Sequence, residues 1–214
     1  MYRALVGVGM LCGLMIAVVF QGTRPVIERN RAAALERAIF AVLPAATRRK
    51  TFALDTTQHF TVDADATADR LHAGYDANGV LVGLAIEAAG MGYADTITVL
   101  YGYSPEAQAI IGFRVLSSKE TPGLGDKIET DAAFLDNFVA LDVSLDASGQ
   151  ALQHPLETVK AGKKTEPWQI DGITGATVSS QAIGKTLAAS TGRWLPLIKQ
   201  QPDVFTAGAI RDES

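Results

Sequence analysis

The chain has 214 residues, of which 48% are hydrophobic and 20% are charged, and its formal net charge is −4. This length can build one well-packed domain and an additional segment, and the acidic balance argues against a nucleic-acid-binding surface. Three histidines and the single Cys12 are too few ligands for a zinc, haem or iron–sulfur site, so any redox role has to rest on an organic cofactor.

A membrane anchor is the first predicted element, in residues 1–23. Residues 4–23 contain no charged side chain, and about twenty helical residues span about 30 Å, the thickness of the hydrocarbon layer. A cleaved secretory signal is the alternative, but the run is long for one and no Ala-x-Ala site follows it. By the positive-inside rule, Arg24, Arg29 and Arg31 after the run would outweigh Arg3 before it and keep the rest of the chain in the cytoplasm.

Residues 24–50 are predicted to form an amphipathic stalk. Pro25 stands where a helix can begin, an apolar face follows as far as Leu43, and Pro44 ends the pattern. A stalk that lifts the next domain off the membrane is the simpler interpretation, and a specific docking helix is the alternative. The basic residues 48–50 are interpreted as a solvated or lipid-headgroup contact.

The hydrophobic period changes to that of β-strands between residues 70 and 118. Antiparallel strands are expected at residues 71–75, 80–88, 96–101 and 110–116, and Asn78-Gly79 supplies turn residues between the first two. Gly90-Met91-Gly92-Tyr93 interrupts this pattern. Its two glycines permit a close backbone approach to a flat group, and a flexible loop is the alternative.

Residues 119–127 read Lys-Glu-Thr-Pro-Gly-Leu-Gly-Asp-Lys. Pro122 fixes one backbone dihedral while Gly123 and Gly125 open others, which predicts a defined turn with exposed backbone N–H groups. Such a turn can hold a planar ligand, and a plain structural turn is the alternative. A helix at residues 131–139 and further strand follow it.

Residues 171–180 read Asp-Gly-Ile-Thr-Gly-Ala-Thr-Val-Ser-Ser and end where a helical pattern begins, at about residues 178–194. The hydroxyls of Thr174, Thr177, Ser179 and Ser180 surround this predicted helix start. Unpaired N–H groups and the helix dipole favour an anion such as phosphate there. A plain capped helix is the alternative. Trp168 and Trp194 are interpreted as core residues.

Two of these segments resemble the motifs of the FMN-binding domain family. Thr174-Gly175-Ala176-Thr177, followed by Val178-Ser179-Ser180, resembles the flavinylation motif, and Asp171 matches its acidic start. The segment from Glu120 to Gly125 is similar to the other hallmark of two related proteins. These are the G subunit of the Rnf electron-transport complex and the C subunit of the sodium-translocating NADH:quinone reductase. The chain length, the short N-terminus and the continuation through residues 125–129 point to the family of Rnf G subunits.

The resemblance implies an α+β fold, in which the transmembrane helix and the stalk precede an antiparallel-sheet FMN-binding domain with packed helices at residues 51–200. The polar composition of residues 201–214 predicts a poorly ordered tail. The resemblance also implies FMN joined by a phosphoester to the hydroxyl of Thr177 by a separate, Mg-dependent flavin transferase. The expected cofactor-binding residues are Thr177 with its loop and phosphate neighbours Asp171, Thr174, Gly175, Ala176, Val178, Ser179 and Ser180, and the flavin walls Glu120, Thr121, Gly123 and Leu124.

By the same resemblance, the function is electron relay within an ion-translocating ferredoxin:NAD oxidoreductase. The partners would be the other Rnf subunits, among them a second covalent-flavin membrane subunit and iron–sulfur subunits, together with membrane lipid. The domain would lie on the periplasmic side of the inner membrane, against the charge rule. No acid–base pair or nucleophile triad is apparent in the sequence, so no catalytic residue is predicted for a soluble substrate.

One departure from the family pattern concerns Ser117-Ser118-Lys119, where many relatives have a histidine, so a proton-transfer role for that histidine cannot be transferred to this chain. Two other classes of protein stay open. One is a regulatory or reductase flavoprotein outside the Rnf complex. The other is a non-redox module that binds a free phosphate-bearing ligand at the helix start.

Overall fold

The computed structural model describes residues 2–63 and 69–207. The chain divides into two compact units, Met1–Arg37 and Ala38–Ser214. The described residues of the first unit are all helical, and the second unit contains the β-sheet and both sequence motifs. The limits expected for the anchor, the stalk and the FMN-binding domain stay predictions.

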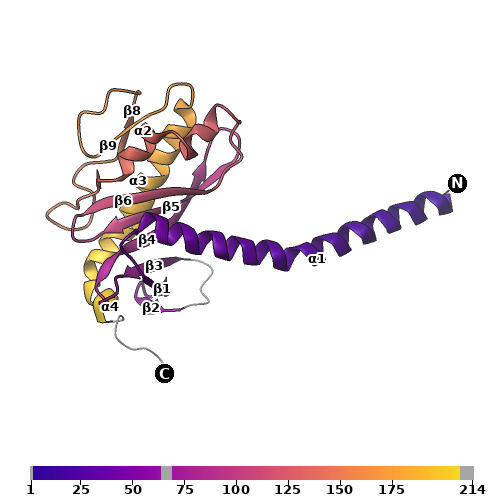
Figure 1. Cartoon of the computed structure of the whole chain (residues 1–214), viewed down its shortest axis with the longest axis horizontal. Helices are drawn as coiled ribbons and strands as arrows, with labels where there is room; N and C mark the ends of the chain where they lie inside the picture. The colour runs from indigo at the N-terminus through magenta and orange to yellow at the C-terminus, as the bar shows by residue number, and fades with distance from the viewer. Residues whose placement is uncertain (1, 64–68, 208–214) are drawn as a thin grey trace. The chain divides into compact units, whose positions relative to one another are not determined.

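Helix α1 (Tyr2–Val42) continues through Pro25 without a break (Figure 1). The prediction that a second helix begins at Pro25 is therefore wrong. A proline inside a helix removes one backbone hydrogen bond and costs about 3 kcal/mol, but the alanine- and arginine-rich sequence that follows favours continued helix. Among the described residues, α1 from Val6 onward is the helix long and apolar enough to cross a membrane, judged by length and composition.

The second unit is built on an antiparallel sheet with the strand order β2-β1-β3-β4-β5-β6-β7. The strands are β1 (Arg48–Leu54), β2 (Phe60–Val62), β3 (Arg70–Tyr75), β4 (Leu81–Met91), β5 (Thr96–Ser104), β6 (Ala109–Ser117) and β7 (Leu141–Asp142). The four predicted strands are confirmed as β3 to β6. The predicted turn before β4 is confirmed too, because Gly79 has a φ of 82° that glycine adopts readily.

Strand β1 was not predicted, and its first residues are the basic segment that the sequence analysis placed in the stalk. Arg48 pairs with Tyr75 of β3, and Phe52 is buried in the core. Strand β1 pairs with β2 only from Phe52 onward. Within the described ranges, residues 48–51 therefore pair with β3 and have no paired strand on the other side. Basic side chains are common on such exposed edges, so composition alone does not separate this strand from a charged surface segment.

Helix α3 (Thr177–Gln200) covers one face of the sheet (Figure 1). It confirms the predicted helix and extends it beyond Trp194, with Pro196 inside. Its apolar side chains join those of β3 to β6 in one core, which includes Leu84, Ile86, Tyr101, Phe113, Ile183, Leu187, Trp194 and Leu195. Gly90 allows close packing here, because a Cβ on it would lie 1.9 Å from Oγ1 of Thr186.

The opposite face of the sheet carries four glycines, Gly74, Gly83, Gly102 and Gly112, one on each of β3 to β6; we call them the glycine stripe. Gly74 lies opposite Gly83, and Gly102 lies opposite Gly112. A Cβ on Gly112 would lie 2.4 Å from the carbonyl oxygen of Val42, and one on Gly74 would lie 2.8 Å from Cδ1 of Leu43. The glycine stripe thus lets the end of α1 pack directly on the sheet backbone.

Short elements complete the second unit. They are η1 (Gly125–Glu129), α2 (Ala132–Leu135), η2 (Asp136–Phe138), the parallel pair β8 (Glu157–Val159) and β9 (Gln169–Asp171), and α4 (Pro202–Ala207). The helix predicted at residues 131–139 is found as two short elements, the four-residue α2 and the 3-10 helix η2, and not as one continuous α-helix. The expectation of a poorly ordered tail is wrong for α4, because Phe205 is buried against Phe52 and Phe60. Helix α4 has six residues, which is too few to show a helical period in the sequence. Residues 208–214 lie outside the described residues.

Candidate functional site

The two sequence motifs meet in a pocket of about 320 Å³, which we call the Thr177 pocket. Its lining residues are Tyr93, Glu120, Thr121, Leu124, Gly125, Gly175, Ala176, Thr177, Val178 and Ser179. The structure therefore brings together most of the residues that the resemblance assigns to flavin binding. It does not bring Asp171, Gly123, Thr174 or Ser180 into this lining.

Thr177 is the first residue of α3, and its side chain is exposed. Ala176 occupies the position before it and offers no side-chain acceptor to the helix start. The first backbone hydrogen bond of the helix runs from the N–H of Ser180 to the carbonyl of Ala176, at 2.9 Å. The alternative of a plain helix capped by a hydroxyl therefore does not hold. Such an uncapped end favours an anion through its N–H groups and dipole.

Asp171 fixes the start of the loop instead of facing the Thr177 pocket. Its carboxylate accepts the backbone N–H groups of Gly162 at 2.8 Å and Lys163 at 3.1 Å. The buried side chain of Asn137 accepts the N–H of Asp171 at 2.9 Å and donates to its carbonyl at 3.1 Å. Asn137 is a structural support that the sequence analysis missed, because no local pattern links it to a residue so far along the chain.

Ser179 and Ser180 are buried, and both hydroxyls have protein partners. The hydroxyl of Ser179 donates to Oε2 of Glu120. The hydroxyl of Ser180 donates to the carbonyl of Ala176 at 2.9 Å and accepts the N–H of Ile173 at 3.1 Å. These contacts hold the first turn of α3 in place. Both hydroxyls therefore support the loop, and the expected contact of Ser179 and Ser180 with a phosphate stays a prediction.

Glu120 is 6% exposed, and its carboxylate lies at the junction of three segments. Oε1 accepts the N–H groups of Tyr93 and Ala94, each at 2.9 Å, and Oε2 accepts the hydroxyl of Ser179. Burial acts to raise the pKa of Glu120, but the hydrogen bonds from Ser179, Ala94 and Tyr93 outweigh it and hold the pKa below its usual value. The carboxylate is therefore ionised at neutral pH.

The two glycines of the predicted turn are needed for different reasons. Gly123 has a φ of 78°, which disfavours residues with a Cβ. A Cβ on Gly125 would lie 2.5 Å from Oε2 of Glu120 and 2.9 Å from Oγ of Ser179. The expectation that this turn has a defined geometry is confirmed. Leu124 lies between the two glycines with its side chain exposed at the Thr177 pocket.

Three exposed apolar or aromatic side chains line the Thr177 pocket: Tyr93, Leu124 and Val178. Tyr93 is 72% exposed and was not among the predicted site residues, although its segment was singled out for two glycines and an aromatic ring. Apolar side chains that gather at an exposed pocket are typical of a binding surface. Neither tryptophan lines this pocket. Trp194 lies in the core, and the ring of Trp168 stacks on that of His154 with 3.9 Å between the ring centroids.

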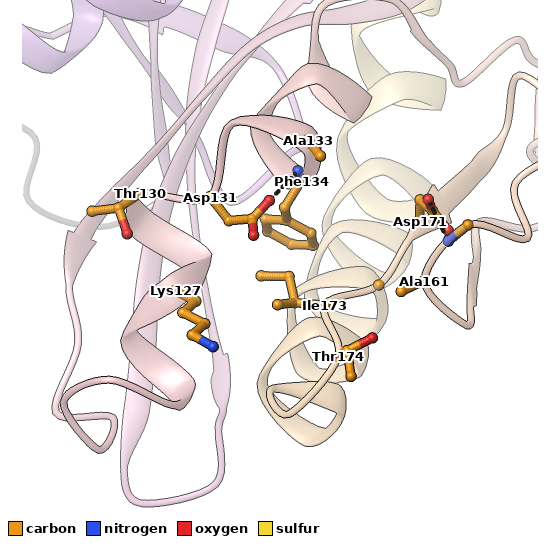
Figure 2. Close-up of a pocket in the computed structure, with 11 residues that line it drawn as sticks. Lys127, Thr130, Asp131, Ala133, Phe134, Ala161, Asp171, Ile173 and Thr174 are labelled. Atoms are coloured by element: carbon orange, nitrogen blue, oxygen red, sulfur yellow. Dashed lines mark hydrogen bonds between the residues drawn. The ribbon is translucent and has the colours of Figure 1, made fainter.

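Thr174 lines a different pocket, of about 410 Å³, together with Asp171, Gly172 and Ile173 of the same loop. Figure 2 shows this second pocket between the loop and Lys127. At its edge, the carboxylate of Asp131 accepts a hydrogen bond from the N–H of Phe134 at 2.9 Å. The loop thus presents Thr174 and Thr177 to different surroundings. Of these two threonines, Thr177 lines the pocket that also contains Glu120, Thr121 and Leu124.

No group of three His, Cys, Asp or Glu side chains that could hold a metal ion occurs in the described part of the chain. The polar groups of the Thr177 pocket include the hydroxyls of Thr121, Thr177 and Ser179, the hydrogen-bonded carboxylate of Glu120 and the start of α3. The surroundings therefore suit an organic ligand with an anionic end and an apolar body.

Residues 92–190 match the FMN-binding domain family. The chain is 36% identical over 113 residues to the G subunit of the ion-translocating oxidoreductase complex of Methanosarcina acetivorans, an alignment that covers 51% of this chain and 50% of that protein. It is 31% identical to the corresponding G subunit of Cereibacter sphaeroides, with 83% and 75% of the two chains covered. It is 30% identical to that of Shewanella piezotolerans, with 85% and 82% covered.

Two crystal structures share the fold. NqrC of Shewanella oneidensis superposes with a TM-score of 0.54 over 80% of this chain and 88% of that chain, at 20% identity. The C subunit of the Na(+)-translocating NADH-quinone reductase of Parabacteroides distasonis superposes with a TM-score of 0.61 over 80% and 95%, at 17% identity. At these identities the likeness establishes the fold, which agrees with the α+β class expected from the sequence.

Proposed function

The chain belongs to the family of G subunits of ion-translocating oxidoreductase complexes, and from this we propose that it is a membrane-anchored flavoprotein that relays electrons within such a complex. One observation supports the proposal above the others. The two motifs, which lie on either side of α2 in the sequence, form one pocket around an exposed threonine hydroxyl.

FMN is joined through its phosphate to Oγ1 of Thr177 in this proposal. The helix start beside Thr177 has no side-chain cap, so its N–H groups and dipole favour the negative charge of a phosphodiester. Thr174 lies in the other pocket, and the hydroxyls of Ser179 and Ser180 are buried. Of the four hydroxyl-bearing residues in the loop, Thr177 is the one that is both exposed and part of the lining of the Thr177 pocket.

The flavin ring lies among Tyr93, Leu124 and Val178 in this proposal. These side chains would exclude water from one side of the ring, and aromatic and apolar groups stack well on a planar ring system. Thr121 and Gly125 complete the wall of the pocket. FMN, when bound, supplies the capacity to accept and to donate electrons, and the protein supplies position and surroundings.

We also propose the partners and the side of the membrane from the family. The partners are the other subunits of an Rnf-type complex, and a separate flavin transferase attaches the FMN. Helix α1 anchors the chain in the inner membrane, and the second unit lies on the periplasmic side. What supports the anchor is the length and composition of α1.

The full chain, produced in its natural membrane with an active flavin transferase, provides the test. Intact mass should show one added FMN, the purified protein should absorb visible light as a flavin does, and it should co-purify with several membrane proteins. A flavin-loaded protein that co-purifies with no membrane partner would contradict the role in a complex. A colourless protein of unmodified mass would contradict the flavoprotein itself.

A further inference from the structure

Glu120 connects three segments that are far apart in the sequence. Its Oε1 accepts the N–H groups of Tyr93 and Ala94 just after β4, and its Oε2 accepts the hydroxyl of Ser179 in the first turn of α3. We propose that Glu120 is a positioning residue for flavin attachment, whose buried carboxylate fixes both walls of the Thr177 pocket before any flavin is bound. This inference rests on the proposed function.

The neighbouring segments leave room for this carboxylate. A Cβ on Gly92 would lie 2.4 Å from Oε1 of Glu120, and a Cβ on Gly125 would lie 2.5 Å from Oε2. Real Cβ atoms do not approach oxygen so closely, so both positions need glycine as long as the carboxylate stays where it is. Ile97 also crowds the Cβ position of Gly92, with its Cδ1 at 2.6 Å, and Oγ of Ser179 lies 2.9 Å from that of Gly125. Glu120 is therefore the one side chain that crowds both glycine positions, but not the only one at either.

The effect on Thr177 is indirect. Ser179 is the third residue of α3, so the bond from Ser179 to Glu120 fixes the rotation of the turn that directs Thr177 and Val178 outward. The bonds to Tyr93 and Ala94 fix the opposite wall. Glu120 carries negative charge near the positive end of the α3 dipole, which favours this arrangement. Loss of the carboxylate would leave the buried hydroxyl of Ser179 and the partly buried N–H groups of Tyr93 and Ala94 without this acceptor. An unsatisfied buried donor costs more than its hydrogen bond contributes.

Three variants of the full chain in detergent separate a positioning role from a general structural one. Glu120→Ala removes the acceptor, Glu120→Gln keeps an acceptor oxygen of the same shape for Tyr93 and Ala94, and Glu129→Ala removes an exposed carboxylate from the neighbouring η1. Two quantities are measured. One is amide hydrogen exchange at residues 91–97 and 176–180 of the protein made without flavin transferase, and the other is the rate of covalent FMN attachment once the transferase is added.

Glu120→Ala should raise exchange at both stretches and slow FMN attachment, each by at least about tenfold, since hydrogen bonds to a charged group are lost. Glu120→Gln should recover most of both quantities, and Glu129→Ala should match the unaltered protein. Attachment at the normal rate in Glu120→Ala, or normal exchange at Tyr93 and Ala94, would overturn the proposal.

A second variant keeps the test decisive if Glu120→Ala fails to fold. Ser179→Ala removes one donor of the cluster and should still raise exchange at residues 176–180 and slow attachment. Normal values of both would overturn the proposal equally well. The exchange measurement needs no flavin. If the unaltered protein accepts no FMN, the proposed function fails, while exchange still reports on whether Glu120 orders the pocket.

Discussion

The carbonyl oxygen of Val42, the last residue of α1, lies 2.3 Å from the place that a Cβ on Gly102 would occupy. The next residue, Leu43, packs with both of its methyl groups against the glycine stripe. The end of α1 thus packs directly on the backbone of β3 to β6 at the glycine stripe. A methyl group added to one of these glycines would displace it.

Gly102→Ala should lower the free energy of unfolding of the full chain in detergent by about 1–3 kcal/mol, because an added methyl group overfills a closely packed site. Gly192→Ala is the matched control. That glycine lies in α3 with nothing within 4 Å of its Cβ position, so alanine should leave stability unchanged or raise it slightly. Equal stability of the two variants in denaturant titrations would show that the contact with Val42 adapts without cost.

Thr177→Ala should abolish covalent flavin, because no other exposed hydroxyl of the loop lines the same pocket. Flavin fluorescence of the denatured protein on a gel and intact mass both measure this. Thr174→Ala is the control, since Thr174 lines the other pocket, and it should keep most of the FMN. FMN that persists in Thr177→Ala, or that maps to Thr174, Ser179 or Ser180, would contradict the assignment.

His72 should make stability depend on pH. The ring is 2% exposed, Nδ1 is 3.0 Å from the hydroxyl of Thr51, and Nε2 has no hydrogen-bond partner among the described residues. Burial, with smaller contributions from Arg70 and Arg49, lowers the pKa of His72 from 6.5 to about 4. Between these values the unfolded chain binds a proton that the folded chain does not, so stability falls as the pH falls.

The slope from this one group is at most about 1.4 kcal/mol per pH unit, and it declines toward zero as the pH rises above 6.5 or falls below about 4. His72→Asn, which keeps a side-chain nitrogen near Thr51, should flatten the profile between pH 6.5 and 4.5. The lowered pKa of Glu120 affects stability only below its ordinary value of 4.5. Thermal unfolding of both proteins across this interval measures the difference, and parallel profiles would exclude His72 as the cause.

The second unit should lie outside the cytoplasm. Asp203 in α4 is exposed, so a cysteine there, in a Cys12→Ser background, is accessible to a thiol reagent. An impermeant reagent should label it in cells whose outer membrane alone has been opened. Labelling that requires rupture of the inner membrane would place the unit in the cytoplasm, as the arginines after the apolar run suggest.

Strands β3 to β6 and helix α3 could be predicted because each has enough residues to show a clear period. The motifs could be recognised because they are local in sequence. The hydrogen bonds of Glu120 could not be predicted, since its donors Tyr93 and Ser179 are brought to it only by the folded sheet and by α3. Helix α1 continues past Pro25, where the alanine- and arginine-rich sequence that follows offsets the lost backbone hydrogen bond. The presence of a proline alone does not show whether a helix begins there or continues through it.

Further strand was expected after residue 139 without bounds, and β8 and β9 lie in that region, whereas helix α4 was not predicted. Strands β8 and β9 have three residues each, which is too short for alternation to stand out, and α4 has six, which is too short for a helical period. Their positions depend on tertiary contacts such as the burial of Phe205 between Phe52 and Phe60. Tyr93 was within reach of sequence reasoning, because an aromatic ring directly after two closely spaced glycines is unusual in a regular strand.

The absence of a side-chain cap at the start of α3 links the stability of the protein to its loading with FMN. Ala176 provides no side-chain acceptor for the first N–H groups of α3, whereas a serine or an aspartate at this position would. The cofactor phosphate would take the place of that acceptor. The phosphate of FMN would then act as part of the fold, and we expect the loaded protein to melt at a higher temperature than the empty one. A helix cap and a favourable dipole interaction together are worth about 1–2 kcal/mol. Empty chains would be the first to unfold and be degraded, so the amount of this protein in a cell should follow the supply of flavin.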